Sequence, residues 1–275
     1  MTSGTTSGIE TATRGTVQVQ REGHVATLIF DHPPRNMLTT SMFEELGRHV
    51  RALDADPDVR AVVIRGAGER LYTVGADISE MAVVEQWERR EANTAAWLGG
   101  IKDVLDAIAH SPKVYICAMK GHSYGGGLET AAACDIRVAA RDARFAMPEV
   151  KLGIIPGYGG TQRIARLIGM GHALTLVLGA REIDAATAEQ WGLVDVVTPP
   201  GEAETTAQAM AQAIGQYAPI ALANAKRAIR AGVDLDISAG LAEETERFIA
   251  CVTSHDFDEG RHAFLEKRRP VFQGV

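Results

Sequence analysis

The sequence has few cysteines, few aromatic residues and no excess of positive charge. Its three cysteines, Cys117, Cys134 and Cys251, are far apart and form no CxxC or Cys/His pattern, which excludes a disulfide-rich scaffold and a zinc finger. The net charge of −7 argues against non-specific binding to nucleic acid or to an anionic membrane, because such binding needs clustered lysine and arginine. A reducing, cytoplasmic environment is the expectation that follows.

Long apolar runs and nucleotide or metal motifs are also missing. The longest stretch free of charged residues, Thr205 to Ala225, is interrupted by glutamine, proline and asparagine, so no membrane span is expected. The N-terminus lacks the charged and apolar regions of a secretory signal. GIIPGYGGTQR does not meet the G-x-G-x-x-G pattern and the histidines show no HExxH spacing, so neither NAD nor a metal is expected.

The sequence does contain enough apolar residues, 46%, for a globular core. Residues 1–14 are rich in threonine, serine and glycine and are expected to be a disordered tail. Over residues 15–199, strand and helix patterns alternate, which predicts an α/β fold with helices covering a mostly parallel sheet. Residues 200–275 show only helical patterns and are expected to pack on a neighbouring subunit or back on their own chain.

Particular elements can be predicted from periodicity. TVQVQ and VATLIF, separated by a turn, predict a hairpin from Thr16, and the next apolar pattern predicts a helix with Ser41 as its N-cap. VRAVVIRG and VYICAM have the composition of buried strands. Between them, apolar residues at i, i+3, i+4 and i+7 from Ile101 predict a helix that ends before Pro112.

Residues 121–130, GHSYGGGLET, admit two chemical interpretations. The first is the G-x-S-x-G elbow of a serine hydrolase, with Ser123 as nucleophile and Asp195 followed by His255 or His262 as its partners. The motif is weak evidence, because a glycine-rich chain produces it by chance.

The second interpretation depends on the glycines and on Glu129. Glycines at the start of a helix let another molecule approach N–H groups that have no partner within the helix, and the helix terminus favours a developing anion. The loop TVGADI supplies a second N–H group if the strands VRAVVIRG and VYICAM are neighbours, which makes an oxyanion hole. Glu129 then points back toward the same cavity.

Several motifs together carry a resemblance to a known family. VGADISEM, GHSYGGGLE, CDIRVAARDARFAMPEVKLGIIPGYGGTQR and FLEKRRPVF resemble, in order and spacing, the enoyl-CoA hydratase (crotonase) family. The resemblance covers nearly everything after the N-terminal tail. It implies a crotonase-like (ClpP/crotonase) α/β spiral of β-β-α units followed by a C-terminal helical trimerisation region, assembled as a homotrimer or a dimer of trimers.

The resemblance also implies roles for individual residues. The oxyanion-hole N–H groups are assigned to Val74 and Gly126, and Glu129 and Glu149 match the two catalytic glutamates of the hydratases. Glu129 is expected to activate water and Glu149 to protonate C2 of the enoyl thioester. Since members with other activities often lack one or both glutamates, hydration of a 2-enoyl-CoA in fatty-acid β-oxidation or related acyl-CoA metabolism is the expected reaction.

Coenzyme A is expected to enter as part of the substrate, with no separate cofactor. The positions assigned to binding the thioester are Arg35, Ala76, Asp77, Ile78 and Lys267.

Other activities stay open at this point. They are another crotonase-type reaction, such as enoyl-CoA isomerisation or a branched-chain or hydroxyacyl-CoA dehydratase, and acyl-CoA binding without turnover. The sequence also departs from the family pattern at Val74, commonly alanine, and at Ser123 and Tyr124, commonly small or aliphatic. These departures bear on substrate preference more than on reaction type.

Overall fold

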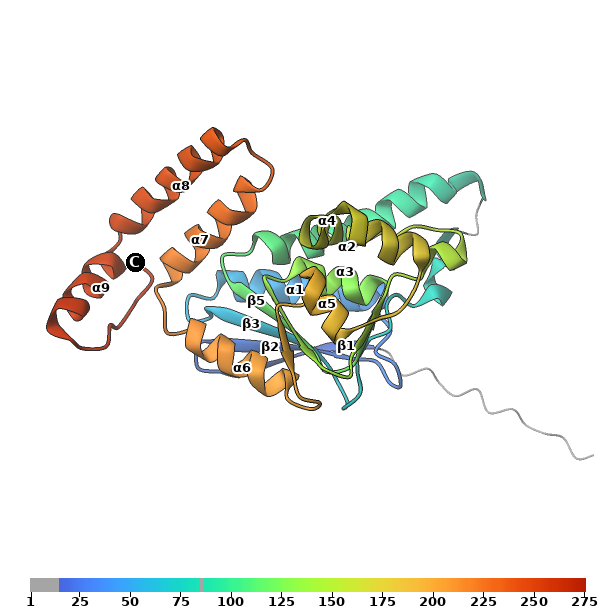
Figure 1. Cartoon of the computed structure of the whole chain (residues 1–275), viewed down its shortest axis with the longest axis horizontal. Coiled ribbons are helices and arrows are strands. Elements are labelled where there is room, and N and C mark those ends of the chain that lie inside the picture. The colour runs from blue at the N-terminus through green and yellow to red at the C-terminus, as the bar shows by residue number, and fades with distance from the viewer. Residues whose placement is uncertain (1–14, 85–86) are drawn as a thin grey trace, which may run out of the picture.

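The structure of this protein is a computed structural model that describes residues 15–84 and 87–275. The predicted tail, residues 1–14, lies outside the described residues. Strands and helices alternate through the first two thirds of the described chain, and only helices and their connections follow residue 199 (Figure 1). The predicted α/β class is confirmed, while the predicted division into 15–199 and 200–275 stays a prediction.

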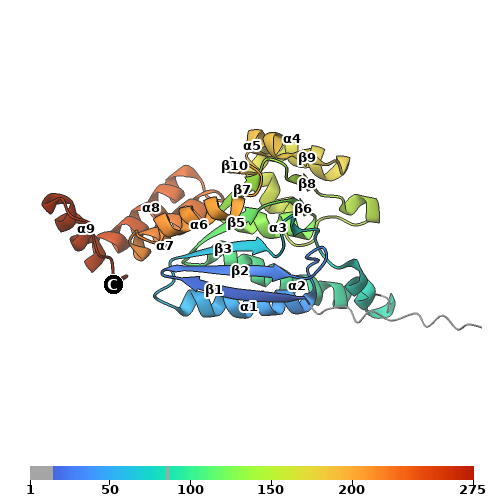
Figure 2. The same cartoon turned by 90° about the horizontal axis from the view of Figure 1, so that it is seen from below.

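The larger sheet of the described residues has the strand order β1-β2-β3-β5-β7-β10 (Figure 2). β1 and β2 form the predicted antiparallel hairpin, and every other pair in this sheet is parallel. β3 and β5 pair directly, so the condition set for a second N–H group is met and the loops after both strands lie at the same edge. The strands are β1 Thr16–Glu22, β2 Val25–Asp31, β3 Ala61–Gly66, β5 Val114–Met119, β7 Ile136–Ala140 and β10 Val196–Thr198.

A smaller sheet has the order β4-β6-β8-β9, and its first three strands each follow one strand of the larger sheet. The chain therefore repeats a unit of large-sheet strand, small-sheet strand and helix: β3-β4-α2, β5-β6-α3 and β7-β8-α4. This is the predicted spiral of β-β-α units. The bounds are β4 Leu71–Thr73, β6 His122–Tyr124, β8 Arg144–Ala146, β9 Ile183–Asp184, α2 Arg90–His110, α3 Gly126–Ala133 and α4 Gly160–Gly179.

Helices cover both faces of the larger sheet. On one face, α1 (Thr40–Ala55) and α2 to α4 enclose the main apolar core, to which α1 contributes Phe43, Leu46 and Val50. On the other face lies α6 (Ala203–Ile214), whose small residues Ala203, Ala207 and Ala211 pack closely on the strands (Figure 2). The remaining short elements are η1 Ile78–Val84, η2 Trp87–Arg89, η3 Glu149–Leu152 and α5 Ala185–Trp191.

The N-cap of α1 differs from the prediction. Thr39 caps the helix, because its side-chain oxygen accepts a hydrogen bond of 3.2 Å from the Met42 N–H. Ser41 lies inside the first turn and hydrogen-bonds to the Thr39 hydroxyl instead. Three consecutive residues of capping type, Thr39, Thr40 and Ser41, made the boundary ambiguous in the sequence.

The last three helices, α7 (Pro219–Gly232), α8 (Ile237–Val252) and α9 (His255–Glu266), extend away from the sheets (Figure 1). The chain end is held to the core by Arg60, whose guanidinium donates hydrogen bonds to the carbonyls of Gly215 and Phe272. α7 and α8 contain no buried residue, and the extension exposes large apolar side chains such as Phe248 and Phe264. None of the helices described is both long and apolar enough to cross a membrane.

Candidate active site

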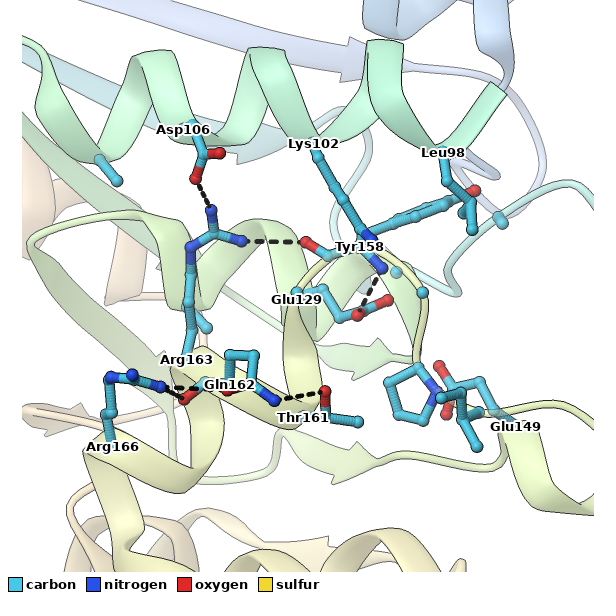
Figure 3. A pocket seen from close by; sticks show the side chains of 18 of the residues that line it. Leu98, Lys102, Asp106, Glu129, Glu149, Tyr158, Thr161, Gln162, Arg163 and Arg166 are labelled. Atoms are coloured by element: carbon cyan, nitrogen blue, oxygen red, sulfur yellow. Dashed lines mark hydrogen bonds and ion pairs between the residues drawn. The ribbon is translucent and has the colours of Figure 1, made fainter. Parts of the chain in front are cut away.

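The two predicted glutamates line one cavity of about 1030 Å³ (Figure 3). Glu129 lies in the first turn of α3, and Glu149 begins η3, directly after β8 and Pro148. Both are buried, with exposed fractions of 2% and 9%. The cavity therefore brings together two carboxyl groups that are 20 residues apart in sequence and belong to successive β-β-α units.

Glu129 is held in one orientation by the loop that precedes α4. Its Oε1 atom accepts hydrogen bonds from the backbone N–H groups of Tyr158, at 2.8 Å, and Gly160, at 2.6 Å. A Cβ atom on Gly160 would lie 2.8 Å from both Cγ and Oε1 of Glu129. Only glycine leaves room for the carboxylate here.

Arg163 fixes the same loop. Its Nη1 atom donates a hydrogen bond of 2.9 Å to the Tyr158 carbonyl, and its guanidinium pairs with Asp106 of α2 (Figure 3). Gly159 has φ +103°, and a Cβ atom there would lie 2.2 Å from Nη1 of Arg163. The motif GYGGTQR was visible in the sequence, but its function in positioning Glu129 was not predicted.

Glu149 has a different environment. Its Oε2 atom is buried and has no hydrogen-bond partner among the described residues, which leaves it available to a bound molecule. Gly125, at φ +49°, allows this carboxyl to approach the start of α3, since a Cβ atom on Gly125 would lie 2.8 Å from Oε1 of Glu149. Gly125, the first of the three glycines in GHSYGGGLET, is thus needed to leave space for the Glu149 carboxyl group.

Two backbone N–H groups without a partner among the described residues lie close together at the start of α3, but one is not the predicted one. The Val74 N–H donates to the Arg35 carbonyl at 3.4 Å, and Val74 does not line the cavity. Ala76 and Gly126 do line it, and the Ala76 nitrogen lies 3.4 Å from where a Cβ atom on Gly126 would be. Neither of their N–H groups donates to another described residue. The pair of free N–H groups at the cavity is therefore that of Ala76 and Gly126, so the predicted Val74 is replaced by the residue two positions further along the chain.

The carboxyl groups bind protons more tightly than exposed glutamates do. Burial raises the pKa of Glu129 to about 7, and the charge of Glu149 acts in the same direction, while the N–H groups of Gly160 and Tyr158 oppose the rise. Burial also raises the pKa of Glu149. Because two carboxylates in one buried site repel each other, they titrate as one coupled system that keeps a proton near neutral pH.

This proton binding predicts a pH-dependent effect of Glu129→Gln on stability. The pKa of Glu129 is about 7 in the folded protein against an ordinary value of 4.5, so the free energy of unfolding falls as pH rises between these values. Glutamine removes that loss, which is on the order of 3 kcal/mol at most. Thermal unfolding at pH 5 and pH 8 should show the variant gaining stability over the unmodified protein only at pH 8. An equal difference at both values contradicts the shifted pKa.

The other predicted binding residues are not gathered at the cavity. Arg35 is exposed and contributes only its carbonyl to the loop of Val74. The Asp77 carboxylate accepts hydrogen bonds from Ser79, and Ile78 is exposed. Lys267 is the C-cap of α9, the helix that lies farthest from α3 and α4 in the extension (Figure 1). Within one chain, Ala76 is the member of the predicted set that lines the cavity.

The serine-hydrolase interpretation is wrong. Ser123 lies in β6 with no exposed surface, and its hydroxyl has no partner among the described residues. Asp195 pairs with Arg137, and His255 and His262 belong to α9 in the extension. The G-x-S-x-G pattern arises where a short buried strand meets the glycines of α3.

Comparisons with known proteins agree with this geometry. The model of the family described as enoyl-CoA hydratase/isomerase matches residues 20–275. The short-chain-enoyl-CoA hydratase of Clostridium acetobutylicum is 40% identical over 92% of this chain and 95% of its own. The 2,3-dehydroadipyl-CoA hydratase of Escherichia coli is 36% identical over 93% and 98%.

Solved structures give the same result. The crystal structure of an enoyl-CoA hydratase from Bacillus anthracis has a TM-score of 0.88 and 34% identity, and covers 94% of this chain and 99% of that one. Both the sequence match and the fold match extend over nearly the whole chain. This protein belongs to the enoyl-CoA hydratase/isomerase family.

Proposed function

We propose that this protein is an enoyl-CoA hydratase, a lyase that adds water reversibly across the 2,3 double bond of a 2-enoyl-CoA to give a 3-hydroxyacyl-CoA. The observation that carries the proposal is the pair Glu129 and Glu149 in one cavity with the N–H groups of Ala76 and Gly126. Its place is fatty-acid β-oxidation or related acyl-CoA metabolism. The names of the relatives from C. acetobutylicum and E. coli support this reaction.

The arrangement accounts for each proton and charge in the reaction. The thioester carbonyl accepts hydrogen bonds from Ala76 and Gly126, which stabilise the negative charge that develops on its oxygen. Glu129, fixed by Tyr158 and Gly160, takes a proton from the water that attacks C3. Glu149 gives its proton to C2. The pair ends with the proton moved from one carboxyl to the other, and exchange with solvent restores it.

The same proposal includes an oligomeric state and a cellular location. Exposed apolar side chains on α7 to α9, including Ile237, Phe248 and Phe264, support a homotrimer or a dimer of trimers in which these helices pack on a second copy. In such an assembly Lys267, remote from its own cavity, would bind the CoA of a neighbouring subunit. Three cysteines with free thiols support a cytoplasmic setting.

A direct assay tests the reaction. With crotonyl-CoA, we expect loss of the absorbance of the conjugated enoyl thioester and formation of 3-hydroxybutyryl-CoA, because water adds across the double bond. A product with a moved double bond would instead support isomerisation. Binding of crotonyl-CoA without any product, together with no hydration of longer or carboxylate-terminated 2-enoyl-CoA thioesters, would contradict the proposed hydration and favour a binding protein.

A further inference from the structure

The cavity continues past the glutamates into a charged region. Around the two carboxyl groups its wall is apolar and aromatic, with Trp97, Leu98 and the buried ring of Tyr158. Farther along α2 and α4 the lining changes to charged side chains, which in Figure 3 lie on the side of Glu129 away from Glu149. These include Lys102, Asp106, Arg163 and Arg166.

Most of these charges already have partners within the protein. Arg163 pairs with Asp106, and Arg166 pairs with Asp234 at 3.1 Å. Arg230, at the same end, pairs with Asp135, which does not line the cavity. The arginines are thus held in ion pairs and fix the shape of the wall.

Lys102 is the exception among the charged side chains described along this wall. It has neither an ion pair nor a hydrogen bond with another described residue, although Asp106 lies one turn further along α2 and pairs with Arg163. In Figure 3 its side chain extends from α2 toward the loop of Tyr158, above Glu129. An ammonium group there is available to a ligand that occupies the cavity.

The lining sets requirements for the acyl chain. An acyl chain that continues past the glutamates would place its first carbons after C3 against Trp97, Leu98 and Tyr158 and bury apolar surface. A longer alkyl chain would then have to displace water from charged groups without replacing its hydrogen bonds. A terminal carboxylate, in contrast to an alkyl terminus, would be stabilised among these charged groups, because it forms a charge-assisted hydrogen bond with an ammonium group. It also needs such a partner here, since the glutamate pair already carries negative charge.

We infer that the charged end of the cavity binds a carboxylate at the far end of a short acyl chain, with Lys102 as its counter-ion. The substrate class is then the CoA monothioester of a 2-enedioic acid of about five or six carbons. The inference rests on the proposed hydratase function and adds the chemistry of the acyl terminus. Lys102 would therefore determine specificity and take no part in the chemical step, because it contacts the acyl terminus and not the reacting atoms.

A pair of matched substrates tests it. 2-Hexenoyl-CoA and 2,3-dehydroadipyl-CoA have six-carbon acyl chains and differ at the terminus, methyl against carboxylate. We expect the unmodified protein to show the higher kcat/KM with the carboxylate. Lys102→Met should lower kcat/KM for this substrate about tenfold and leave 2-hexenoyl-CoA nearly unchanged, because the methionine keeps the alkyl stem and removes only the charge. Lys151→Met, which removes an exposed lysine outside the cavity, is the control and should change neither value.

Each other outcome is decisive. A preference for 2-hexenoyl-CoA in the unmodified protein, or an unchanged ratio in Lys102→Met, overturns the inference and leaves the hydratase function intact. An equal rise in KM for both substrates assigns Lys102 to the phosphates of CoA and also overturns it. Failure to hydrate either thioester would overturn the proposed function and this inference together.

Discussion

Glu129→Gln is expected to lower kcat for hydration of crotonyl-CoA about 10³-fold, and Glu149→Gln is expected to lower it by a similar factor. Glutamine is nearly isosteric with glutamate, so Tyr158 and Gly160 can still donate to the side-chain oxygen at position 129. What is lost is the ability to take a proton from water or to give one to C2. KM should change much less, because in the proposed function the thioester is bound by Ala76, Gly126 and the apolar wall.

The double variant distinguishes a working pair from two independent groups. If one proton passes between water, the two carboxyls and C2, then removing either group stops the same step, and the double variant should be little worse than a single one. If the fold-loss in kcat of the double variant equals the product of the two single losses, the two glutamates act separately. A single variant that retains activity within tenfold of the unmodified protein would exclude that glutamate from the chemistry.

A loss of folded-state stability is not expected to explain the lower activity of the two glutamine variants. Since burial raises the pKa of both carboxyls, each glutamine variant removes a cost of burying a charge, and its thermal unfolding above pH 7 should occur at the same or a higher temperature. Rates and unfolding temperatures measured on the same samples separate a chemical effect from a structural one. An inactive variant that is also unstable at pH 8 would contradict this interpretation.

The sequence predicted best those structural features that depend on a single residue type, such as apolar residues in buried strands and glycines at a helix terminus. The composition of buried strands predicted β3 and β5 themselves, and the glycines before Glu129 predicted an open helix terminus facing a ligand. In the smaller sheet, β4, β6 and β9 were not predicted individually, because segments of two or three residues show no alternation.

The errors at the site have a common physical origin. Val74 and Ala76 stand two residues apart in one loop, and only the path of the backbone decides which N–H group is free. The Val74 N–H donates to the Arg35 carbonyl, whereas the Ala76 nitrogen lies beside Gly126 and donates to no described residue. Local sequence carries no signal for that path. Likewise, Lys102 and Glu129 belong to different helices, so their common cavity depends on packing.

Gly160→Ala is expected to lower kcat about 10²-fold without touching any group that reacts. Gly160 begins α4 with ordinary helical geometry, so alanine costs nothing in backbone conformation. Its Cβ would nevertheless lie 2.8 Å from Cγ and Oε1 of Glu129, and the carboxylate must move away from the N–H groups of Tyr158 and Gly160. A displacement of about 1 Å from the reactive position is enough for a loss of this size.

Gly171→Ala is the matched control, because Gly171 lies in the second helical segment of α4, beyond the non-helical Gly169, with nothing within 4 Å of its Cβ position. It should keep full activity and gain slightly in stability from the better helix propensity of alanine. In Gly160→Ala the loss should appear in kcat, since the thioester contacts at Ala76 and Gly126 are unchanged. If Gly160→Ala instead keeps the activity of Gly171→Ala, then the orientation of Glu129 imposed by the loop is not required for hydration, and the base would have to act from more than one position.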